Sequence, residues 1–307
     1  MNRSTAALCV LSVLVAGCVR APLAPQTYNG EALEAARAAA TRGEFDQARA
    51  AYRALLAGDG VDRALVMRLL ARVEHEAGNY EEAEGLLLEA LDVVERGFGR
   101  NHPKVGWVAS ELGPVYQSAS RLPEAEYFHR RALELLEPVL DPTDTHLSIL
   151  LNNLGSVLVA QDRHEEAVTL IERAHQLSVE GRADGYDHPA AMFLVNLADA
   201  YRQMGRLADA EEAYRSALAS QRVTEGYRAN LIALTCLDGL AEVEADRDEL
   251  ETATTLLRAA IAIGERILEA GQAHRPGMPL YEHTQVQLQR LNDRYREIRA
   301  LLGGSWV

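Results

Sequence analysis

The sequence contains very little lysine, few aromatic residues and no long hydrophobic run. Lys104 is the only lysine among 31 basic residues, and 45 acidic residues bring the formal net charge to −14. This balance argues against a nucleic-acid partner, because phosphate binding requires a basic face. Aromatic residues make up only 6% of a chain that is 48% hydrophobic. Since Ala, Leu, Glu and Arg dominate the rest, the composition favours helices over a β-sandwich or barrel.

Cysteine is also scarce, and two of the three cysteines lie in the N-terminal segment. A basic start ending at Arg3 precedes an apolar stretch, Ala6 to Ala16, that is followed by Gly17 and Cys18. This stretch is shorter than the ~20 residues needed to span a bilayer. It therefore predicts a secretory signal peptide over residues 1–17. The third cysteine, Cys236, lies in an apolar helical stretch and is predicted to be a buried small hydrophobe.

The residues around the cleavage site resemble the lipobox of bacterial lipoproteins. The resemblance implies that Cys18 carries diacylglycerol and an acylated amine and becomes the mature N-terminus. Val19 at the next position implies sorting to the outer membrane. An ordinary signal peptide with an incidental cysteine is the alternative. Residues 18–29 contain Pro22 and Pro25, which predicts an extended tether without a core.

One short phrase recurs along the rest of the chain: a polar turn, an apolar residue, two further residues and an alanine, followed three or four residues later by a large residue and a second alanine. Its first alanines stand at Ala48, Ala83, Ala125, Ala167, Ala210 and Ala253. Gly43, Gly78 and Gly205 stand where a helix ends and a left-handed residue is needed. Small residues let two helices approach closely, and large residues fill the gaps between them. Each copy therefore predicts a helix hairpin whose apolar face is buried by stacking on its neighbours.

This pattern resembles the tetratricopeptide repeat over roughly residues 30–270. The long spacing of the alanines and the pairs His102-Pro103 and His188-Pro189 resemble the kinesin-light-chain subclass. The resemblance implies an all-α fold, a right-handed α-solenoid of about six helix hairpins in residues 30–278. At Asn101 and His102, the polar side chains are predicted to cap a helix that starts at Pro103.

The C-terminal part is predicted to close the solenoid. Residues 279–302 are amphipathic and are predicted to form a capping helix. Residues 303–307 form a short tail in which Trp306 is expected to dock, with a free hydrophobic end as the alternative. The apolar positions assigned to the buried side of this helix are Leu280, Val286, Leu288, Leu291, Tyr295, Ile298 and Leu301.

The sequence indicates no active site, metal site or cofactor. His75-Glu76 and His164-Glu165 each lack the second histidine of a zinc-protease motif. Gly97 and Gly99 lack the third glycine of a nucleotide loop and follow a predicted helix rather than a strand. We therefore expect a chain that is not an enzyme and that binds no cofactor.

A groove is the predicted binding surface. In the family that the chain resembles, the first helices of successive hairpins line a concave surface that holds a partner segment. Asn153 and Asn196 resemble the groove asparagines of that family, whose amides bind a peptide backbone; polar packing inside the fold is the alternative reading. The candidate groove residues are Asn152, Asn153, Asn196, Asp199, Arg202, Trp107, Glu111, Arg68 and Arg72.

Two further expectations concern this groove. Asn152, Asn153 and Ser156 are expected to turn away from the deepest part of the helix face that carries Leu151, Leu154 and Leu158. A charge gradient is also expected, with Arg68, Arg72 and His75 at one end and Asp199, Asp238 and Glu242 at the other. Such a gradient would orient an extended peptide, because complementary charge sets register more than affinity.

These features predict a membrane-anchored lipoprotein that faces the periplasm and serves as an adaptor in the bacterial envelope. The expected partner is a protein or extended peptide of an envelope machine, such as a pilus, secretion or cell-wall complex. Two alternatives stay open: an interaction lipoprotein on the cell surface, and an enzyme with a site built across the groove.

Overall fold

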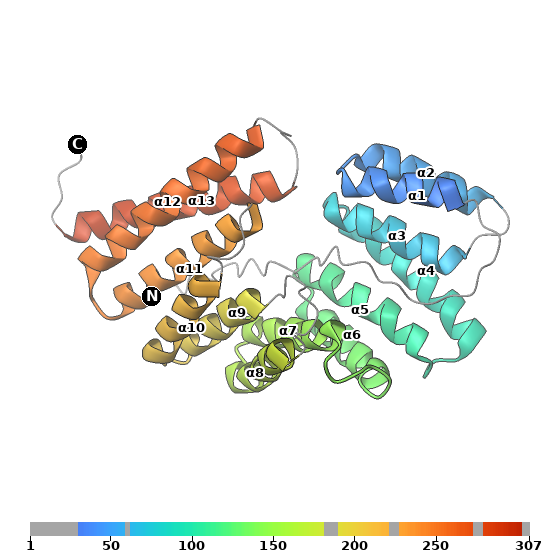
Figure 1. Ribbon diagram of the computed structural model, residues 1–307, viewed down its shortest axis with the longest axis horizontal. Coiled ribbons are helices and arrows are strands. Elements are labelled where there is room, and N and C mark those ends of the chain that lie inside the picture. Colours follow the sequence, from blue (N-terminus) through green and yellow to red (C-terminus); the bar gives the residue numbers. More distant parts are fainter. Residues whose placement is uncertain (1–29, 59–61, 181–189, 221–226, 273–278, 303–307) are drawn as a thin grey trace. The chain divides into compact units, whose positions relative to one another are not determined.

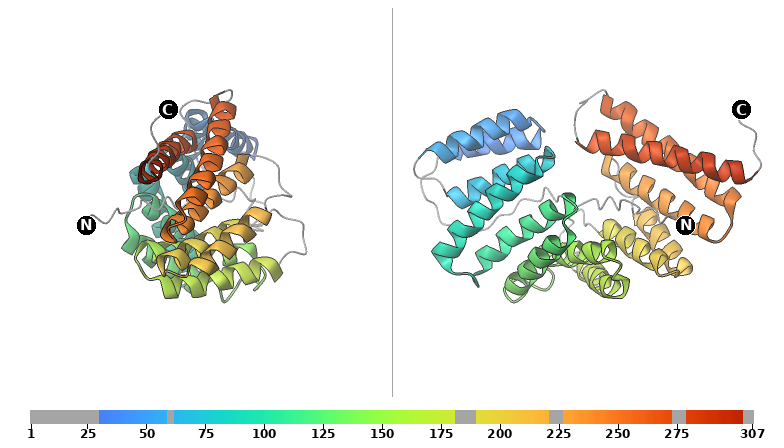
Figure 2. Two further views of the ribbon diagram at one scale, coloured as in Figure 1. Left: turned by 90° about the vertical axis from the view of Figure 1, so that its left-hand side faces the viewer. Right: turned by 180° about the vertical axis from the view of Figure 1, so that it is seen from behind.

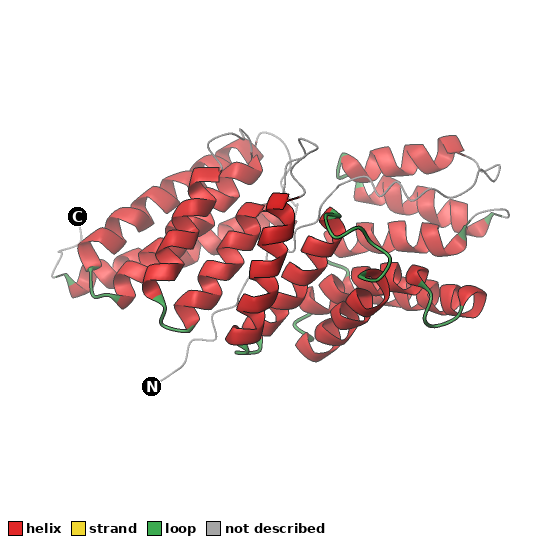
Figure 3. Cartoon of the chain, turned by 60° about the horizontal axis from the view of Figure 1, so that its bottom comes forward, coloured by secondary structure: helices red, strands yellow, loops and turns green. Residues whose placement is uncertain are grey.

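The structure is a computed structural model that describes residues 30–58, 62–180, 190–220, 227–272 and 279–302. All regular secondary structure in these ranges is helical (Figure 3). The helices are α1 (Gly30–Thr41), α2 (Phe45–Ala57), α3 (Arg63–Glu76), α4 (Tyr80–Phe98), α5 (Pro103–Ser118), α6 (Leu122–Leu136), α7 (Thr145–Ala160), α8 (His164–Glu180), α9 (Ala190–Gln203), α10 (Leu207–Ser220), α11 (Tyr227–Asp246), α12 (Leu250–Gln272) and α13 (Pro279–Leu301). The predicted all-α fold of helix hairpins with a further C-terminal helix is confirmed. Among the described helices, none has the length and apolarity that crossing a bilayer requires.

The helices form two compact units, the first ending at Gln161 and the second beginning at Asp162. In the first unit each helix from α1 to α7 packs against the next one along the chain, and in the second unit α8 to α13 do the same (Figures 1 and 2). The first helices of neighbouring hairpins also touch, α3 with α5, α5 with α7, and α9 with α11. The first unit thus stacks the hairpins α1–α2, α3–α4 and α5–α6 and ends with α7, and the second unit begins with α8 and stacks the hairpins α9–α10 and α11–α12 with α13.

The turn between the two helices of each hairpin contains one residue in the left-handed conformation. Gly43, Gly78 and Gly205 have φ angles of 71°, 82° and 74°, which confirms their predicted role. Three residues with side chains occupy the same place in the other hairpins: Ser120, Asp162 and Asp248, with φ of 58°, 60° and 66°. In the turn after α3, the amide of Asn79 donates to the carbonyl of Glu74 at 2.8 Å. This is the bond that closes a Schellman motif and satisfies a helix-terminal carbonyl.

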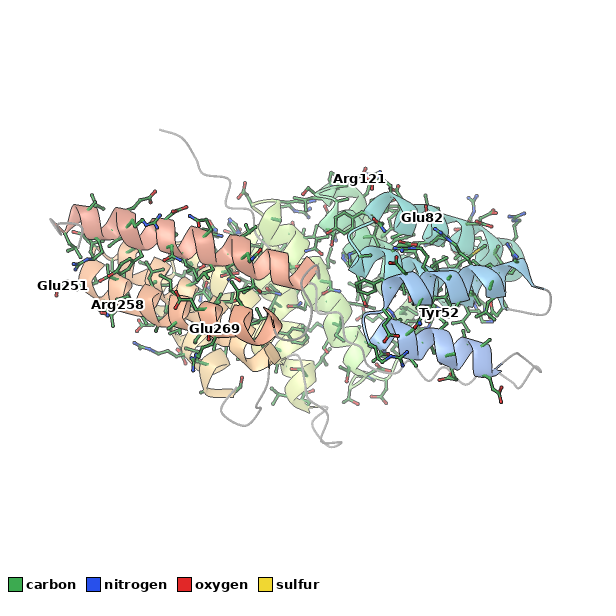
Figure 4. All side chains as sticks on the ribbon, turned by 90° about the horizontal axis from the view of Figure 1, so that it is seen from above. Tyr52, Glu82, Arg121, Glu251, Arg258 and Glu269 are labelled. Atoms are coloured by element: carbon green, nitrogen blue, oxygen red, sulfur yellow. The ribbon has the colours of Figure 1, made fainter. Side chains whose placement is uncertain are left out.

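The repeated alanines let the two helices of a hairpin approach closely. All six, from Ala48 to Ala253, are fully buried, and so is the larger residue four positions after each of them. These larger residues are Tyr52, which Figure 4 labels, and Leu87, His129, Ile171, Tyr214 and Leu257. Gly113 of α5 shows how tight the approach is, because a Cβ atom added there would lie 2.3 Å from the ring of His129. The predicted division between small and space-filling residues is therefore confirmed.

The last helix, α13, buries one narrow stripe against the rest of the second unit. Thr284, Leu291 and Ile298 are buried at intervals of one heptad. Val286 and Leu301, which were assigned to the buried side, are instead 69% and 74% exposed. The prediction was wrong for these two residues because no helix follows α13 in the described residues to cover its second face. Cys18, the tether, His188, Leu280 and Trp306 lie outside the residues or side chains that the structure describes.

Candidate functional site

The candidate site is the surface formed by the first helices of the hairpins, which we call the first-helix face. In the first unit it comprises α3, α5 and α7, and its side chains meet at offsets of about one repeat. Arg68 of α3 donates to both carboxylate oxygens of Glu111 on α5, at 2.8 and 2.6 Å. The ring of Trp107 on α5 meets His146 on α7 edge-on, with centroids 5.0 Å apart. Successive first helices are thus joined by polar and aromatic contacts.

Two further polar contacts join the same first helices. His75 of α3 lies with its Nε2 atom 2.8 Å from the hydroxyl of Ser118 on α5. The amide of Gln117 on α5 donates to the hydroxyl of Ser156 on α7 at 3.0 Å. The spacing in the sequence could have predicted these contacts, since residues about one repeat apart on successive first helices face each other.

The exposed part of this face in the first unit is small. The side chains of Arg68 and Glu111 are 21% and 36% exposed, and Arg72 is exposed while Trp107 is half-buried. His75 is buried. Burial lowers the pKa of His75, and a backbone hydrogen bond at Pro114 offsets this only in part. His75 is therefore neutral near pH 7 and does not supply the positive charge that was expected of it.

The asparagines of α7 do not lie where they were expected. Asn152, Asn153 and Ser156 are only 2%, 8% and 3% exposed, as deeply buried as their neighbours Leu151 and Leu154. The expectation that they turn away from the buried side is wrong, because α7 packs on α6 and also contacts α5. Whether Asn153 binds a partner stays a prediction, but its amide does not reach out to solvent in this structure.

In the second unit the first-helix face carries a network of carboxylates and guanidinium groups. Glu242 of α11 lies 2.9 Å from Arg202 of α9, 3.2 Å from Arg290 and 3.0 Å from Arg294, both of α13. Asp238 of α11 is buried and is paired with Arg294. One carboxylate, Glu242, therefore ties three first helices together.

Asp199 of α9 lies at the inner edge of this network. The hydroxyl of Tyr214 on α10 donates to its carboxylate. Burial raises the pKa of Asp199 to about 6, although the hydrogen bond from Tyr214 acts in the opposite direction. Asn196, one turn earlier on α9, is half-buried. Asn196, Asp199 and Arg202 follow one another at intervals of three residues along α9, and whether they bind a partner stays a prediction.

The expected charge gradient is not supported in either unit. Arg68 is neutralised by Glu111 in the first unit. In the second, the acidic residues Asp238 and Glu242 are paired with arginines of the chain itself. The sequence argument missed these partners because Arg290 and Arg294 lie about 50 residues downstream, on a helix that was assigned only a capping role.

The histidines and the cysteine have structural surroundings. His102 precedes α5, and its Nδ1 accepts a hydrogen bond from the amide of Lys104 at 3.1 Å, which confirms its predicted capping role. Cys236 is fully buried, and burial raises its pKa. Within the part of the chain that the structure describes, no cluster of His, Cys, Asp or Glu side chains is arranged to hold a metal ion.

Comparison with known protein families identifies the repeat. Models of the tetratricopeptide repeat match residues 62–137, 146–222 and 233–274. Among curated proteins, the Arabidopsis thaliana protein KINESIN LIGHT CHAIN-RELATED 3 is 25% identical over 207 residues, covering 66% of this chain and 31% of that protein. The human clustered mitochondria protein homolog is 27% identical over 167 residues, covering 54% of this chain and 12% of that protein. The chain thus spans less than a third of either relative.

Solved structures show the same fold at low sequence identity. BtubC (BKLC) from P. vanneervenii superposes with a TM-score of 0.56 and 18% identity, over 82% of this chain and 95% of that one. A putative kinesin light chain from Podosopora anserina, with nearly identical TPR-like repeats, gives a TM-score of 0.53 and 22% identity, over 66% of this chain and 96% of that one. The helical-repeat fold predicted from the sequence is therefore shared with these solved structures.

Proposed function

Because this chain belongs to the tetratricopeptide repeat family, we propose that it is a protein-interaction scaffold, held by a lipid at Cys18 in the bacterial envelope. The first-helix face supports the binding role. It combines accessible polar groups with the half-buried ring of Trp107 on a framework whose own charges are largely paired. Such a surface can bind a partner segment without leaving buried charges unpaired.

Binding rather than catalysis suits the described side chains. On the first-helix face of the second unit, the carboxylates of Asp238 and Glu242 are bonded to arginines and that of Asp199 to Tyr214. A catalytic acid or base needs a neighbouring nucleophile or bound group to act on. Neither Cys236, which is buried and protonated, nor the capping residue His102 offers one.

The proposed anchor rests on the sequence alone. Cys18 follows Ala16 and Gly17 at the end of an apolar stretch, and the tether up to residue 29 separates it from α1. Two or more acyl chains hold a protein on a membrane far more firmly than a single chain. The proposed position is the periplasmic side of the outer membrane, with the cell surface as the other destination of such lipoproteins.

The anchor can be tested by metabolic labelling. The full chain is expressed in a Gram-negative bacterium with an alkyne-tagged fatty acid, and the label on the protein is then measured. We expect labelling of the wild type and of Cys9→Ala, and none of Cys18→Ala, because Cys9 leaves with the signal peptide. Equal labelling of both cysteine variants, or none of the wild type, would refute lipidation at Cys18.

The binding surface can be tested separately by photo-crosslinking. A photoreactive amino acid placed at the exposed Arg72 or the half-buried Asn196 reports on the first-helix face, and Tyr127 on α6, which is 61% exposed, serves as the matched control. We expect the same crosslinked protein from the first two positions and not from Tyr127. Crosslinking from Tyr127 alone would place binding on the second helices and refute this part of the proposal.

A further inference from the structure

His129 of α6 is a fully buried histidine whose ring nitrogens make no hydrogen bond in the described part of the chain. Leu87, Ile171 and Leu257 occupy the same place in other hairpins. Gly113 of α5 lies directly against the imidazole ring, and a Cβ atom there would be 2.5 Å from Nδ1. The site therefore accommodates a neutral imidazole and offers no acceptor for a second ring proton.

The α5 segment that covers His129 is weakened by a proline. Pro114 lies inside α5 and cannot donate the helix hydrogen bond that this position would otherwise make to the carbonyl of Ser110. The same segment is held from α3 by His75, which bonds to the backbone at Pro114 and to the hydroxyl of Ser118. Residues 113–118 are thus packed between two buried histidines, one from α3 and one from α6.

We propose that residues 113–118 of α5 unfold locally at acidic pH, when His129, and with it His75, takes up a proton. A charged His129 cannot remain where it is, because its ring nitrogens would then both donate with nothing to accept. The imidazolium must reach solvent, and the residues that cover it are those of α5 around Gly113.

The surrounding charges give little compensation. Burial is the only cause that lowers the pKa of His129, to about 4, so no charged side chain of α5, α6 or α7 offsets it in the described residues. Around His75, Arg72 and Glu76 come from its own helix, the ring of Tyr80 comes from α4 at 5.6 Å, and Ser118 comes from α5. Burial raises the pKa of Glu76. Its carboxylate therefore also takes up a proton as the pH falls, and it then no longer offers a negative charge to His75.

The size of the effect follows from proton linkage. In the opened segment His129 has an ordinary pKa of 6.5, against about 4 when it is packed. Between pH 8 and pH 5 the opening equilibrium should therefore rise roughly 30-fold from His129 alone. Since α5 also carries Trp107 and Glu111, opening would disturb the first-helix face of the first unit. The inference itself concerns the chain alone and does not depend on the proposed function.

Hydrogen exchange of the full chain tests it, with rates corrected for the intrinsic effect of pH. We expect the amides of Gly113 and of residues 115–118 to lose at least about 30-fold in protection between pH 8 and pH 5 in the wild type, and much less in His129→Leu. The control, His175→Asn, should behave like the wild type because His175 lies on α8 in the second unit, whereas α5 and α6 belong to the first. His75→Gln, which keeps a donor toward Ser118, should retain the roughly 30-fold loss that His129 alone gives.

Two outcomes would overturn the proposal. One is a wild-type segment whose protection does not change between the two pH values. The other is a loss in His129→Leu as large as in the wild type, since the proton would then be bound elsewhere. A pH titration of the His129 ring signals by NMR in the unmodified chain gives a measurement that needs no variant, and an ordinary pKa there would also count against the mechanism.

Discussion

Gly239 of α11 is the position at which a single methyl group should have the clearest effect on stability. A Cβ atom there would lie 2.2 Å from Cζ and 2.5 Å from the hydroxyl of Tyr214, where ordinary contacts are 3.4–4 Å. Tyr214 is fully buried and its hydroxyl is bonded to Asp199. The ring therefore cannot move aside without giving up that hydrogen bond.

The magnitude for Gly239→Ala can be worked from three contributions. Overpacking of a buried site costs about 1–3 kcal/mol. Loss of a hydrogen bond to a carboxylate costs about 1.5 kcal/mol or more. Alanine regains about 1 kcal/mol over glycine inside a helix. The free energy of unfolding should therefore fall by about 1.5–3.5 kcal/mol.

Urea unfolding followed by far-UV circular dichroism measures this change. Gly85→Ala is the matched control, because Gly85 lies inside α4 and nothing lies within 4 Å of an added Cβ atom. We expect Gly85→Ala to stabilise the chain by about 0.5–1 kcal/mol. In a Tyr214→Leu background, Gly239→Ala should lose most of its cost, because leucine ends before the position of Cζ. A cost below about 0.5 kcal/mol in the wild type, or an equal cost in both backgrounds, would refute the reasoning.

Three further predictions use the same assay. Asp199→Asn should raise the free energy of unfolding at pH 7 by about 1–3 kcal/mol. The pKa of Asp199 is about 6 in the folded chain against 3.8 when unfolded, so the wild type loses stability as the pH rises from about 4 to 6, and the variant should not. An equal dependence of stability on pH in both proteins would contradict this. Arg68→Glu should cost about 1–2 kcal/mol and Glu111→Arg in addition should restore most of it, since the two side chains form a bidentate pair; a double variant as unstable as the single one would argue against the pair. Tyr201→Phe should cost about 1 kcal/mol by removing a 2.6 Å hydrogen bond to Glu172, whereas Tyr52→Phe should be neutral or stabilising because its buried hydroxyl has no partner in the described residues; the reverse order would be inconsistent with both hydroxyl environments.

Much of the fold could be predicted because the hairpin repeats the same physical requirements. An alanine at each helix crossing and a left-handed residue at each turn are visible in the sequence, and the structure confirms both. Even the turns without glycine could be located, because Ser120, Asp162 and Asp248 follow the same spacing as Gly78.

The site was less predictable, because helical periodicity identifies a face but not what covers it. Asn153 lies on a helix that is enclosed by its neighbours, so its polar side chain is buried, whereas Arg72 on α3 is exposed. Ion pairs were missed for a related reason. The partner of Arg68 is 43 residues away and that of Asp238 is 56 residues away, and only the stacking of hairpins brings such residues together.

The six hairpins are not equivalent at the large buried position. In the second, fourth and sixth it is filled by Leu87, Ile171 and Leu257, whereas the first, third and fifth carry a side chain with a polar end, Tyr52, His129 and Tyr214. Of these three polar ends only that of Tyr214 has a hydrogen-bond partner in the part of the chain that the structure describes.

A buried polar group without a partner costs about 1–3 kcal/mol. In a repeat protein, stability is close to a sum over repeats and their nearest-neighbour interfaces, so such a cost stays local. The hairpins that contain Tyr52 and His129 should therefore open before the hairpin of Leu87 that lies between them. The aliphatic hairpin thus separates two weaker ones in the first unit, and opening at His129 can occur without unfolding the whole unit.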